Sequence, residues 1–79
     1  PAAWPDSPHV AAALAILGRR ARSGATLHPS SNLELDLGLD SIERVELLAE
    51  LEQRLGVRIP DERAHLLFTA GQLVDAVQA

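Results

Sequence analysis

The sequence predicts a small all-α domain, a four-helix bundle of three main helices, one short helix and a long first loop. Two observations predict this fold. Apolar residues recur at helical spacing in three separate segments, and serine, aspartate or threonine stands where each segment begins. The chain has 79 residues, which allows one domain. We expect residues 1–7, which are rich in proline, to be a linker, and residues 8–79 to be the domain.

The first helix is expected to begin at Pro8. Ser7 precedes it as N-cap, and proline suits the first helical position because no N–H donor is needed there. The predicted buried stripe comprises Val10, Leu14, Leu17 and Ala21. A cluster of cations follows in the last turns, where cations complement exposed carbonyl groups. It comprises Arg19, Arg20 and Arg22. We expect Gly24 to close this helix.

The segment 25–39 breaks the helical pattern. Turn-forming residues are interspersed with leucines, and the alternation over 33–39 would also suit a short strand. A strand is rejected because no second strand exists to pair with it. We therefore expect a long loop that is held to the core by its leucines. The apolar positions are Leu27, Leu33, Leu35 and Leu37.

The second main helix is expected over about 41–55, with Gly56 at its end. Asp40 is a better N-cap than Ser41, because Glu43 then falls at the third helical position and completes a D-x-x-E capping box. Ser41 becomes the first helical residue, and its hydroxyl has no capping role. An anion attached to that hydroxyl would lie at the positive end of the helix dipole.

Two further helices are expected after the second. Pro60 stops any continuation, since the residue before a proline avoids the helical region. Residues 61–67 then predict a short helix with Asp61 as its cap. Thr69 and Gln72 predict a capping box at the start of the last helix. Its inward residues are expected to be Leu73, Val74 and Val77.

The surface of the second helix carries an unusual apolar residue. At about 100° per residue, the leucines and the glutamates occupy separate arcs. The leucine arc comprises Leu47, Leu48, Leu51 and Leu55, and the acidic arc comprises Glu43, Glu46 and Glu50. Ile42 lies near the acidic arc and Ala49, away from the leucines. A single exposed apolar residue usually has no function, but one beside a spare hydroxyl and a carboxylate row is also typical of a docking surface.

The composition argues against several classes of function. The absence of cysteine excludes disulfides and thiolate metal ligands. A net charge of −4 argues against nucleic-acid binding, and His9, His28 and His65 lack the spacing of a metal site. No apolar run could cross a bilayer and no signal peptide opens the chain, so we expect a cytoplasmic protein. Ser41 is not expected to be a nucleophile, since no oriented general base accompanies it.

The run L-x-x-D-L-G-x-D-S-I at 33–42 resembles the attachment motif of acyl carrier proteins, whose usual core is D-S-L. The resemblance continues through V-E-L-L at 45–48, G-V-R-I-P-D-E at 56–62 and T-A-G-Q-L-V at 69–74. With the leading helix it covers nearly the whole chain beyond the linker. It implies a carrier without enzymatic activity of its own.

The resemblance implies a role for each residue around the helix start. Ser41 would receive 4′-phosphopantetheine from coenzyme A, transferred by a separate Mg²⁺-dependent phosphopantetheinyl transferase. The flanking residues of the attachment site are Gly38, Leu39 and Asp40. The implied recognition face comprises Ile42, Glu43, Glu46, Ala49 and Glu50. The other implied partners are acyl-loading and acyl-processing enzymes of fatty acid, polyketide or lipid synthesis, either separate or fused upstream. We expect the isolated domain to be a monomer.

Two other functions stay open from the sequence. A peptidyl or aryl carrier domain of nonribosomal peptide synthesis more often has G-G-x-S at the attachment site, whereas Leu39 and Asp40 precede Ser41 here. A helical interaction module without a prosthetic group would use Ser41 only as a helix start and Ile42 as a binding anchor.

Three features depart from the acyl carrier pattern. Arg44 places a cation beside Ser41, where it either snorkels or contacts the attached phosphate. The segment 66–68 is unusually apolar, and we expect it to belong to the core, with a lipid-lined pocket as the alternative. The remaining cations put an extended negative surface in doubt. They are Arg54, Arg58 and Arg63.

Overall fold

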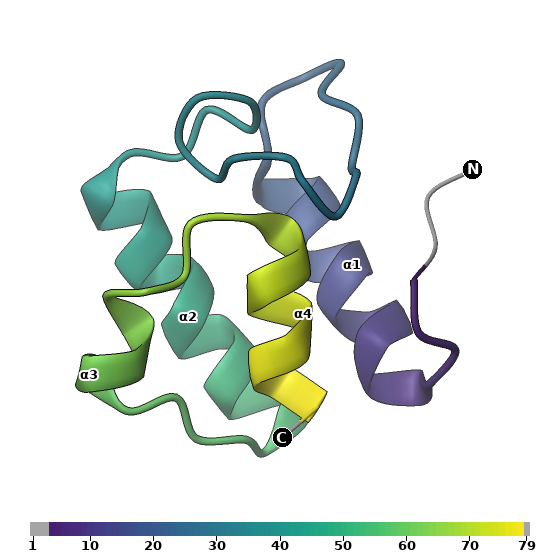
Figure 1. Ribbon diagram of the computed structural model, residues 1–79, viewed down its shortest axis with the longest axis vertical. Helices are drawn as coiled ribbons and strands as arrows, with labels where there is room; N and C mark the ends of the chain where they lie inside the picture. The colour runs from purple at the N-terminus through teal and green to yellow at the C-terminus, as the bar shows by residue number, and fades with distance from the viewer. Residues whose placement is uncertain (1–3, 79) are drawn as a thin grey trace.

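A computed structural model of the chain describes residues 4–78, and within them it contains four helices and no strand. The helices are α1 (Pro8–Arg20), α2 (Ser41–Leu55), α3 (Asp61–Ala64) and α4 (Ala70–Gln78). α1 packs against both α2 and α4, and these two helices run opposite to α1 (Figure 1). The predicted all-α bundle is therefore confirmed.

α1 begins as predicted but buries a wider face. Ser7 is the N-cap, and its hydroxyl oxygen accepts a hydrogen bond from the Val10 N–H at 3.2 Å. Leu14 and Ala21, predicted as core residues, are only half-buried. The buried residues are Val10, Ala13, Ile16 and Leu17. The stripe is wider than predicted because α1 is covered by α2 on one side and by α4 on another.

α1 ends at Arg20, so the prediction that Gly24 closes it is wrong. The reason is a long-range hydrogen bond. The Arg22 N–H donates to the Leu37 carbonyl at 2.8 Å, and because this bond replaces a hydrogen bond within the helix, α1 ends before Arg22. Gly24 lies in the turn that follows, with a φ of 82°.

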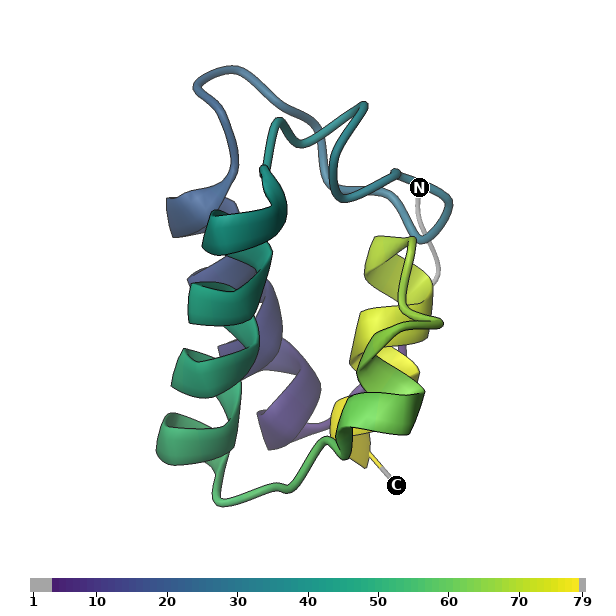
Figure 2. The same ribbon diagram turned by 90° about the vertical axis from the view of Figure 1, so that its left-hand side faces the viewer.

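The loop 21–40 crosses the end of the bundle where α1 ends and where α2 and α4 begin (Figures 1 and 2). Its buried leucines are Leu33, Leu37 and Leu39. Leu35, which we expected to hold the loop to the core, is 84% exposed. The Asn32 side-chain oxygen accepts hydrogen bonds from the N–H groups of Glu34 and Leu35, and the resulting turn directs the Leu35 side chain outward.

The same loop is joined to the start of α4 by backbone hydrogen bonds. The Ala70 N–H donates to the Ser31 carbonyl at 2.9 Å, and the Gly71 N–H donates to the Pro29 carbonyl at 2.8 Å. A Cβ atom on residue 71 would lie 2.8 Å from that carbonyl oxygen, which is closer than real Cβ atoms approach. Gly71 therefore permits the loop to lie directly against α4.

α3 spans Asp61–Ala64 and is shorter than the predicted helix over 61–67. Pro60, not Asp61, stands at the cap position, and no side chain caps the helix. The Leu66 N–H donates to the Arg63 carbonyl, so the helix tightens into a turn instead of continuing.

The apolar segment after α3 is only partly in the core. Leu67 is 5% exposed, as predicted, whereas Leu66 and Phe68 are 63% and 49% exposed. The tight turn after α3 explains the difference, because neighbouring side chains then point in different directions. The expectation that the whole segment is core is therefore wrong.

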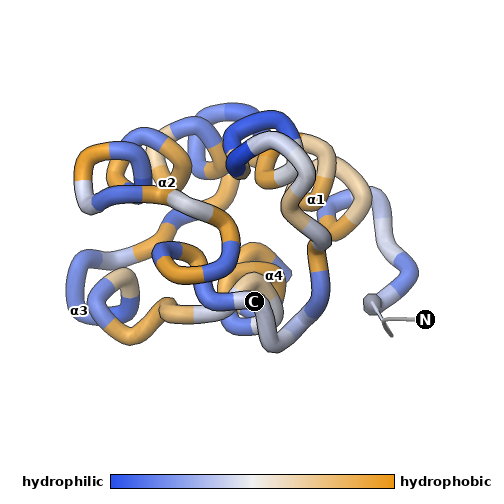
Figure 3. The backbone as a smooth tube through the Cα atoms, turned by 90° about the horizontal axis from the view of Figure 1, so that it is seen from above, coloured by the Kyte–Doolittle hydropathy of each residue, from blue (hydrophilic) through white to orange (hydrophobic). Residues whose placement is uncertain are grey.

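α4 and α2 show the amphipathic pattern on which the bundle depends. The predicted capping box at α4 is present, with the Gln72 N–H bonded to the Thr69 hydroxyl oxygen at 3.2 Å and the Thr69 N–H bonded to Gln72 Oε1 at 3.1 Å. The predicted inward residues Leu73, Val74 and Val77 are all buried. Along α2, hydrophobic and hydrophilic residues alternate in the trace of Figure 3.

The segment before α1 also contributes to the core. Trp4 is half-buried and packs against the hydrophobic cluster of the bundle. Residues 1–3 of the predicted linker, and the last residue, lie outside the described residues.

The two loop leucines 35 and 37 provide a matched test of how the loop is held. Leu37→Ala should lower the free energy of unfolding by about 2–5 kcal/mol, because Leu37 is fully buried. Leu35→Ala should change it by less than about 0.5 kcal/mol, because that side chain is exposed. Urea unfolding followed by circular dichroism measures both. Equal losses would contradict the burial of one leucine and the exposure of the other.

Candidate functional site

The site is built around the first turn of α2. Asp40 Oδ1 accepts a hydrogen bond from the Glu43 N–H at 2.7 Å, and Glu43 Oε1 accepts one from the Asp40 N–H at 3.0 Å. The predicted capping box is therefore confirmed. Ser41 is the first residue of the helix and is exposed. Both capping bonds use carboxylates, so the Ser41 hydroxyl is left free for other chemistry.

The two residues before the capping box fix where the helix starts. Gly38 has a φ of 74°, a backbone conformation that favours glycine. A Cβ atom there would also lie 3.1 Å from the Cβ of Arg22, which covers the turn. Leu39 is buried, and its N–H donates to the Leu33 carbonyl at 3.0 Å. The chain thus reaches Ser41 from an anchored position in the core.

Arg44 makes a contact that the sequence did not reveal. Its Nη1 lies 3.1 Å from Glu34 Oε1 in the loop, and its side chain is 21% exposed. Side chains on a helix point toward its N-terminus, so the guanidinium extends past the turn that contains Ser41. Arg44 therefore joins α2 to the loop through an ion pair with Glu34.

A groove of about 490 Å³ runs between α2 and α3, and Ser41 and Arg44 are among the residues that line it. Apolar side chains line much of the rest, including Val45, Leu48 and Ile59. Its volume falls in the range of roughly 300–1,000 Å³ that is typical of small-molecule sites. A flexible group attached to Ser41 would have this groove beside it.

The face of α2 next to the groove is apolar and exposed. Ile42 is 69% exposed, as its place on the helix predicted. Val45 is 67% exposed and was missed, although its spacing of three residues from Ile42 was a signal that could have found it. With Ala49, which is also exposed, these residues form one stripe, which we call the apolar stripe.

The acidic arc is less uniform than its sequence indicated. The carboxylate of Glu43 is used in the capping box, and the Glu46 side chain is 60% exposed. Glu50 is different, because its side chain is 11% exposed and three arginines surround it.

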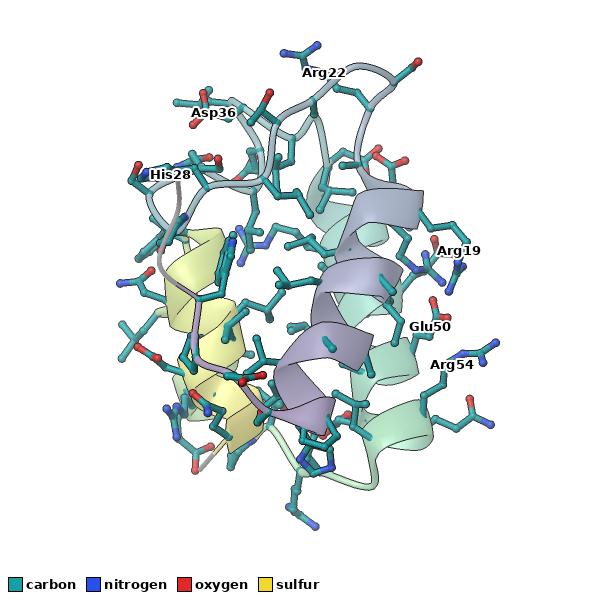
Figure 4. All side chains as sticks on the ribbon, turned by 90° about the vertical axis from the view of Figure 1, so that its right-hand side faces the viewer. Arg19, Arg22, His28, Asp36, Glu50 and Arg54 are labelled. Atoms are coloured by element: carbon teal, nitrogen blue, oxygen red, sulfur yellow. The ribbon has the colours of Figure 1, made fainter. Side chains whose placement is uncertain are left out.

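These three arginines and Glu50 form a cluster, which we call the Glu50 cluster, and Figure 4 labels its members Arg19, Glu50 and Arg54. Arg19 Nη2 lies 2.6 Å from Glu50 Oε2, and Arg20 Nε lies 2.6 Å from Oε1. Arg54 Nε lies 2.8 Å from Oε2. The predicted position of Arg19 and Arg20 in the last turn of α1 is confirmed, and their bonds also join α1 to α2. Arg22, predicted with them, lies beyond the end of α1. A role of Glu50 in recognition stays a prediction.

Among residues 4–78, no group of histidine, aspartate or glutamate side chains is arranged to hold a metal ion. None of the helices described here has the length and apolar character needed to cross a membrane.

Residues 10–77 match the family described as "Phosphopantetheine attachment site". The chain belongs to this family. Its prosthetic group is covalently attached 4′-phosphopantetheine, and its role is that of a carrier and not of an enzyme.

Several similar proteins are named acyl carrier proteins. The acyl carrier protein of Chlorobium phaeobacteroides is 43% identical over 51 residues, which are 65% of this chain and 65% of the relative. The acyl carrier protein of Helicobacter pylori strain G27 is 39% identical over 54 residues, which are 68% of this chain and 69% of the relative. The carrier therefore spans about two thirds of the length of these curated relatives.

The fold comparison reaches further along the chain. The crystal structure of a toxoplasma-specific mitochondrial acyl carrier protein superimposes with a TM-score of 0.68 at 27% sequence identity. The match covers 95% of this carrier and 93% of that chain.

The Glu50 cluster predicts how the stability of the carrier depends on pH. Hydrogen bonds from Arg19, and then from Arg20, lower the pKa of the Glu50 carboxyl from 4.5 to about 2. A lowered pKa stabilises the fold above pH 4.5, and this contribution is lost as the pH falls toward 2. Wild type should therefore lose more stability than Glu50→Gln across this window. Urea unfolding at several pH values measures the difference, and parallel curves for the two proteins would contradict it.

Proposed function

We propose that Ser41 carries the 4′-phosphopantetheine and that the domain presents acyl groups on it to enzymes of fatty acid, polyketide or lipid synthesis. The observation that carries the proposal is the exposed Ser41 hydroxyl, which the capping box leaves free, inside the matched segment 10–77. When bound, the group supplies a thiol that holds acyl groups as thioesters. Relatives named acyl carrier proteins favour acyl over peptidyl or aryl cargo.

The residues around Ser41 fit an attached phosphodiester. The first turn of α2 favours a negative charge, because the N–H groups at a helix start point outward along the dipole. Asp40 and Glu43 keep this turn intact through the capping box. Gly38 and Leu39 hold the preceding backbone in place. The chain itself thus supplies position and a favourable field, while a phosphopantetheinyl transferase supplies the attachment chemistry.

The face of α2 beside Ser41 supports a docking role. Ile42 and Ala49 belong to the exposed apolar stripe, and Glu43 and Glu46 lie on the adjacent arc. Partner enzymes would bury the stripe and place cations near the carboxylates. We expect these enzymes and the carrier to meet in the cytoplasm, with the carrier as a monomer.

The attachment residue is tested by intact-protein mass spectrometry. Incubation with coenzyme A, Mg²⁺ and a promiscuous phosphopantetheinyl transferase should add one phosphopantetheine to wild type. Ser41→Ala should keep its mass, because it lacks the acceptor oxygen. An unmodified wild type, or a modified Ser41→Ala protein, would contradict the proposal.

The docking residues are tested by the rate of the same reaction. Ile42→Ala and Glu46→Lys should each lower kcat/KM several-fold, because they remove an apolar contact and reverse a surface charge. Asp75→Lys makes the same charge change on α4, at an exposed position, and should react like wild type. Circular dichroism checks that all variants keep the fold. Wild-type rates for Ile42→Ala and Glu46→Lys would remove these residues from the docking face.

A further inference from the structure

The Glu50 cluster gives the surface around Glu50 a positive charge. Its three guanidinium groups surround one carboxylate, and Arg20 Nη1 also lies 3.8 Å from Glu46 Oε1. Within the cluster, three positive charges against the one negative charge of Glu50 leave two positive charges. The surface around Glu50, which α1 and α2 form together, is therefore positive, although the whole chain has a net charge of −4.

The positive groups, and not Glu50, reach the solvent. The side chains of Arg19 and Arg54 are 58% and 64% exposed, whereas that of Glu50 is 11% exposed. In Figure 4 the Glu50 side chain lies between those of Arg19 and Arg54. A hollow of about 540 Å³ is lined by the cluster together with Glu46, Ala49 and Gln53. A molecule that approaches this hollow meets the guanidinium groups of Arg19 and Arg54 on one side and the exposed carboxylate of Glu46 on the other.

The positive region adjoins the proposed docking face. Glu46 and Arg54 are eight residues apart, which corresponds to about 12 Å along a helix. This separation exceeds the Debye length of about 8 Å at physiological salt, so Glu46 and Arg54 act separately on an approaching charge, even though Arg20 contacts Glu46. Ala49 belongs both to the apolar stripe and to the lining of the hollow. One continuous surface thus runs from a negative end near Ser41, past apolar residues, to a positive end.

We propose that the Glu50 cluster makes the docking face bipolar and selects partner proteins that present a carboxylate opposite Arg19 and Arg54. On the basis of the proposed function, the partner surface then carries charges of both signs. The partner places its carboxylate opposite Arg19 and Arg54, and it places its cations only opposite Glu43 and Glu46. A partner whose surface is basic along the whole of α2 is repelled at the Arg54 end. Guanidinium groups bind carboxylates through two parallel hydrogen bonds, which makes a partner aspartate or glutamate the fitting group.

A protein partner fits this surface better than a free anion or nucleic acid. The apolar stripe continues into the hollow, and an apolar centre with charged groups at its edge is typical of protein interfaces. Glu46 lies beside the guanidinium groups and would repel a run of phosphates. Glu50 already occupies the inner side of the cluster, so only the outer N–H groups of the arginines are open to a partner.

The test uses a phosphopantetheinyl transferase whose carrier-binding surface is basic along its length. Arg54→Glu should raise kcat/KM by about three- to tenfold over wild type, because it replaces repulsion with attraction at that end. Arg54→Gln should give an intermediate gain and guards against a loss of folding in the first variant. Arg63→Glu, at an exposed position of α3, changes the net charge equally and should alter the rate less than twofold. The gain should shrink as salt is added.

A second arm changes the transferase. A transferase variant with glutamate in place of the basic residue nearest position 54 should prefer wild type over Arg54→Glu. Equal rates for wild type and Arg54→Glu, or equal gains for Arg54→Glu and Arg63→Glu, would overturn the bipolar face. Modification of wild type in the same experiment would still support the proposed function.

Binding gives a readout that does not depend on modification. Ser41→Ala versions of the same proteins should bind the transferase in the same order in surface plasmon resonance. If wild type were not modified, the order of the binding affinities would still test the bipolar face independently of the proposed function. Equal binding of all versions, or binding by none, would overturn the proposal.

Discussion

The position of Ser41 depends on the burial of three leucines in the preceding loop. The loop 21–40 contains no helix, so its backbone is held by side-chain burial and by hydrogen bonds to other segments. Leu33, Leu37 and Leu39 are each at most 2% exposed, and their burial favours the ordered loop. Because Leu39 stands two residues before Ser41, the same burial that orders the loop determines where α2 begins. The loop is therefore part of the site and not only a connection between helices.

At the start of α2, different residues hold the helix and offer the hydroxyl group that can be modified. A serine that served as N-cap would lose its hydroxyl geometry on conversion to a phosphodiester, and the cap would change with it. In this chain the carboxylates of Asp40 and Glu43 satisfy the N–H groups instead. Under the proposed function, Ser41 can be modified without altering the hydrogen bonds that hold the first turn. This explains why two capping residue types stand side by side in the sequence.

Features set by neighbouring residues were predictable from the sequence, and features set by distant ones were not. The caps at Ser7, Asp40 and Thr69 each depend on residues within three positions, and all three are present. The end of α1 depends on the Leu37 carbonyl, which lies far along the chain from Arg22. The exposure of Leu35 is a local exception, because the Asn32 turn that directs it outward lies within three residues. A helical wheel describes one helix at a time, so it cannot show which residues of two helices face one another.

The charge of the proposed docking face could not be predicted from the wheel of α2 alone, because residues of α1 contribute to the Glu50 cluster. The wheel placed Glu50 on an acidic arc, but Arg19, 31 residues away, binds it across the helix interface. The same bonds that join α1 to α2 also gather cations on the surface, so packing and surface charge are coupled at Glu50. Removing that carboxylate would leave the guanidinium groups to repel one another and would weaken the interface. Arg54 is the exception, because it lies on the outer side of the cluster and 64% of its side chain is exposed. Surface charge can therefore vary at position 54 while Arg19, Arg20 and Glu50 continue to hold the helices together.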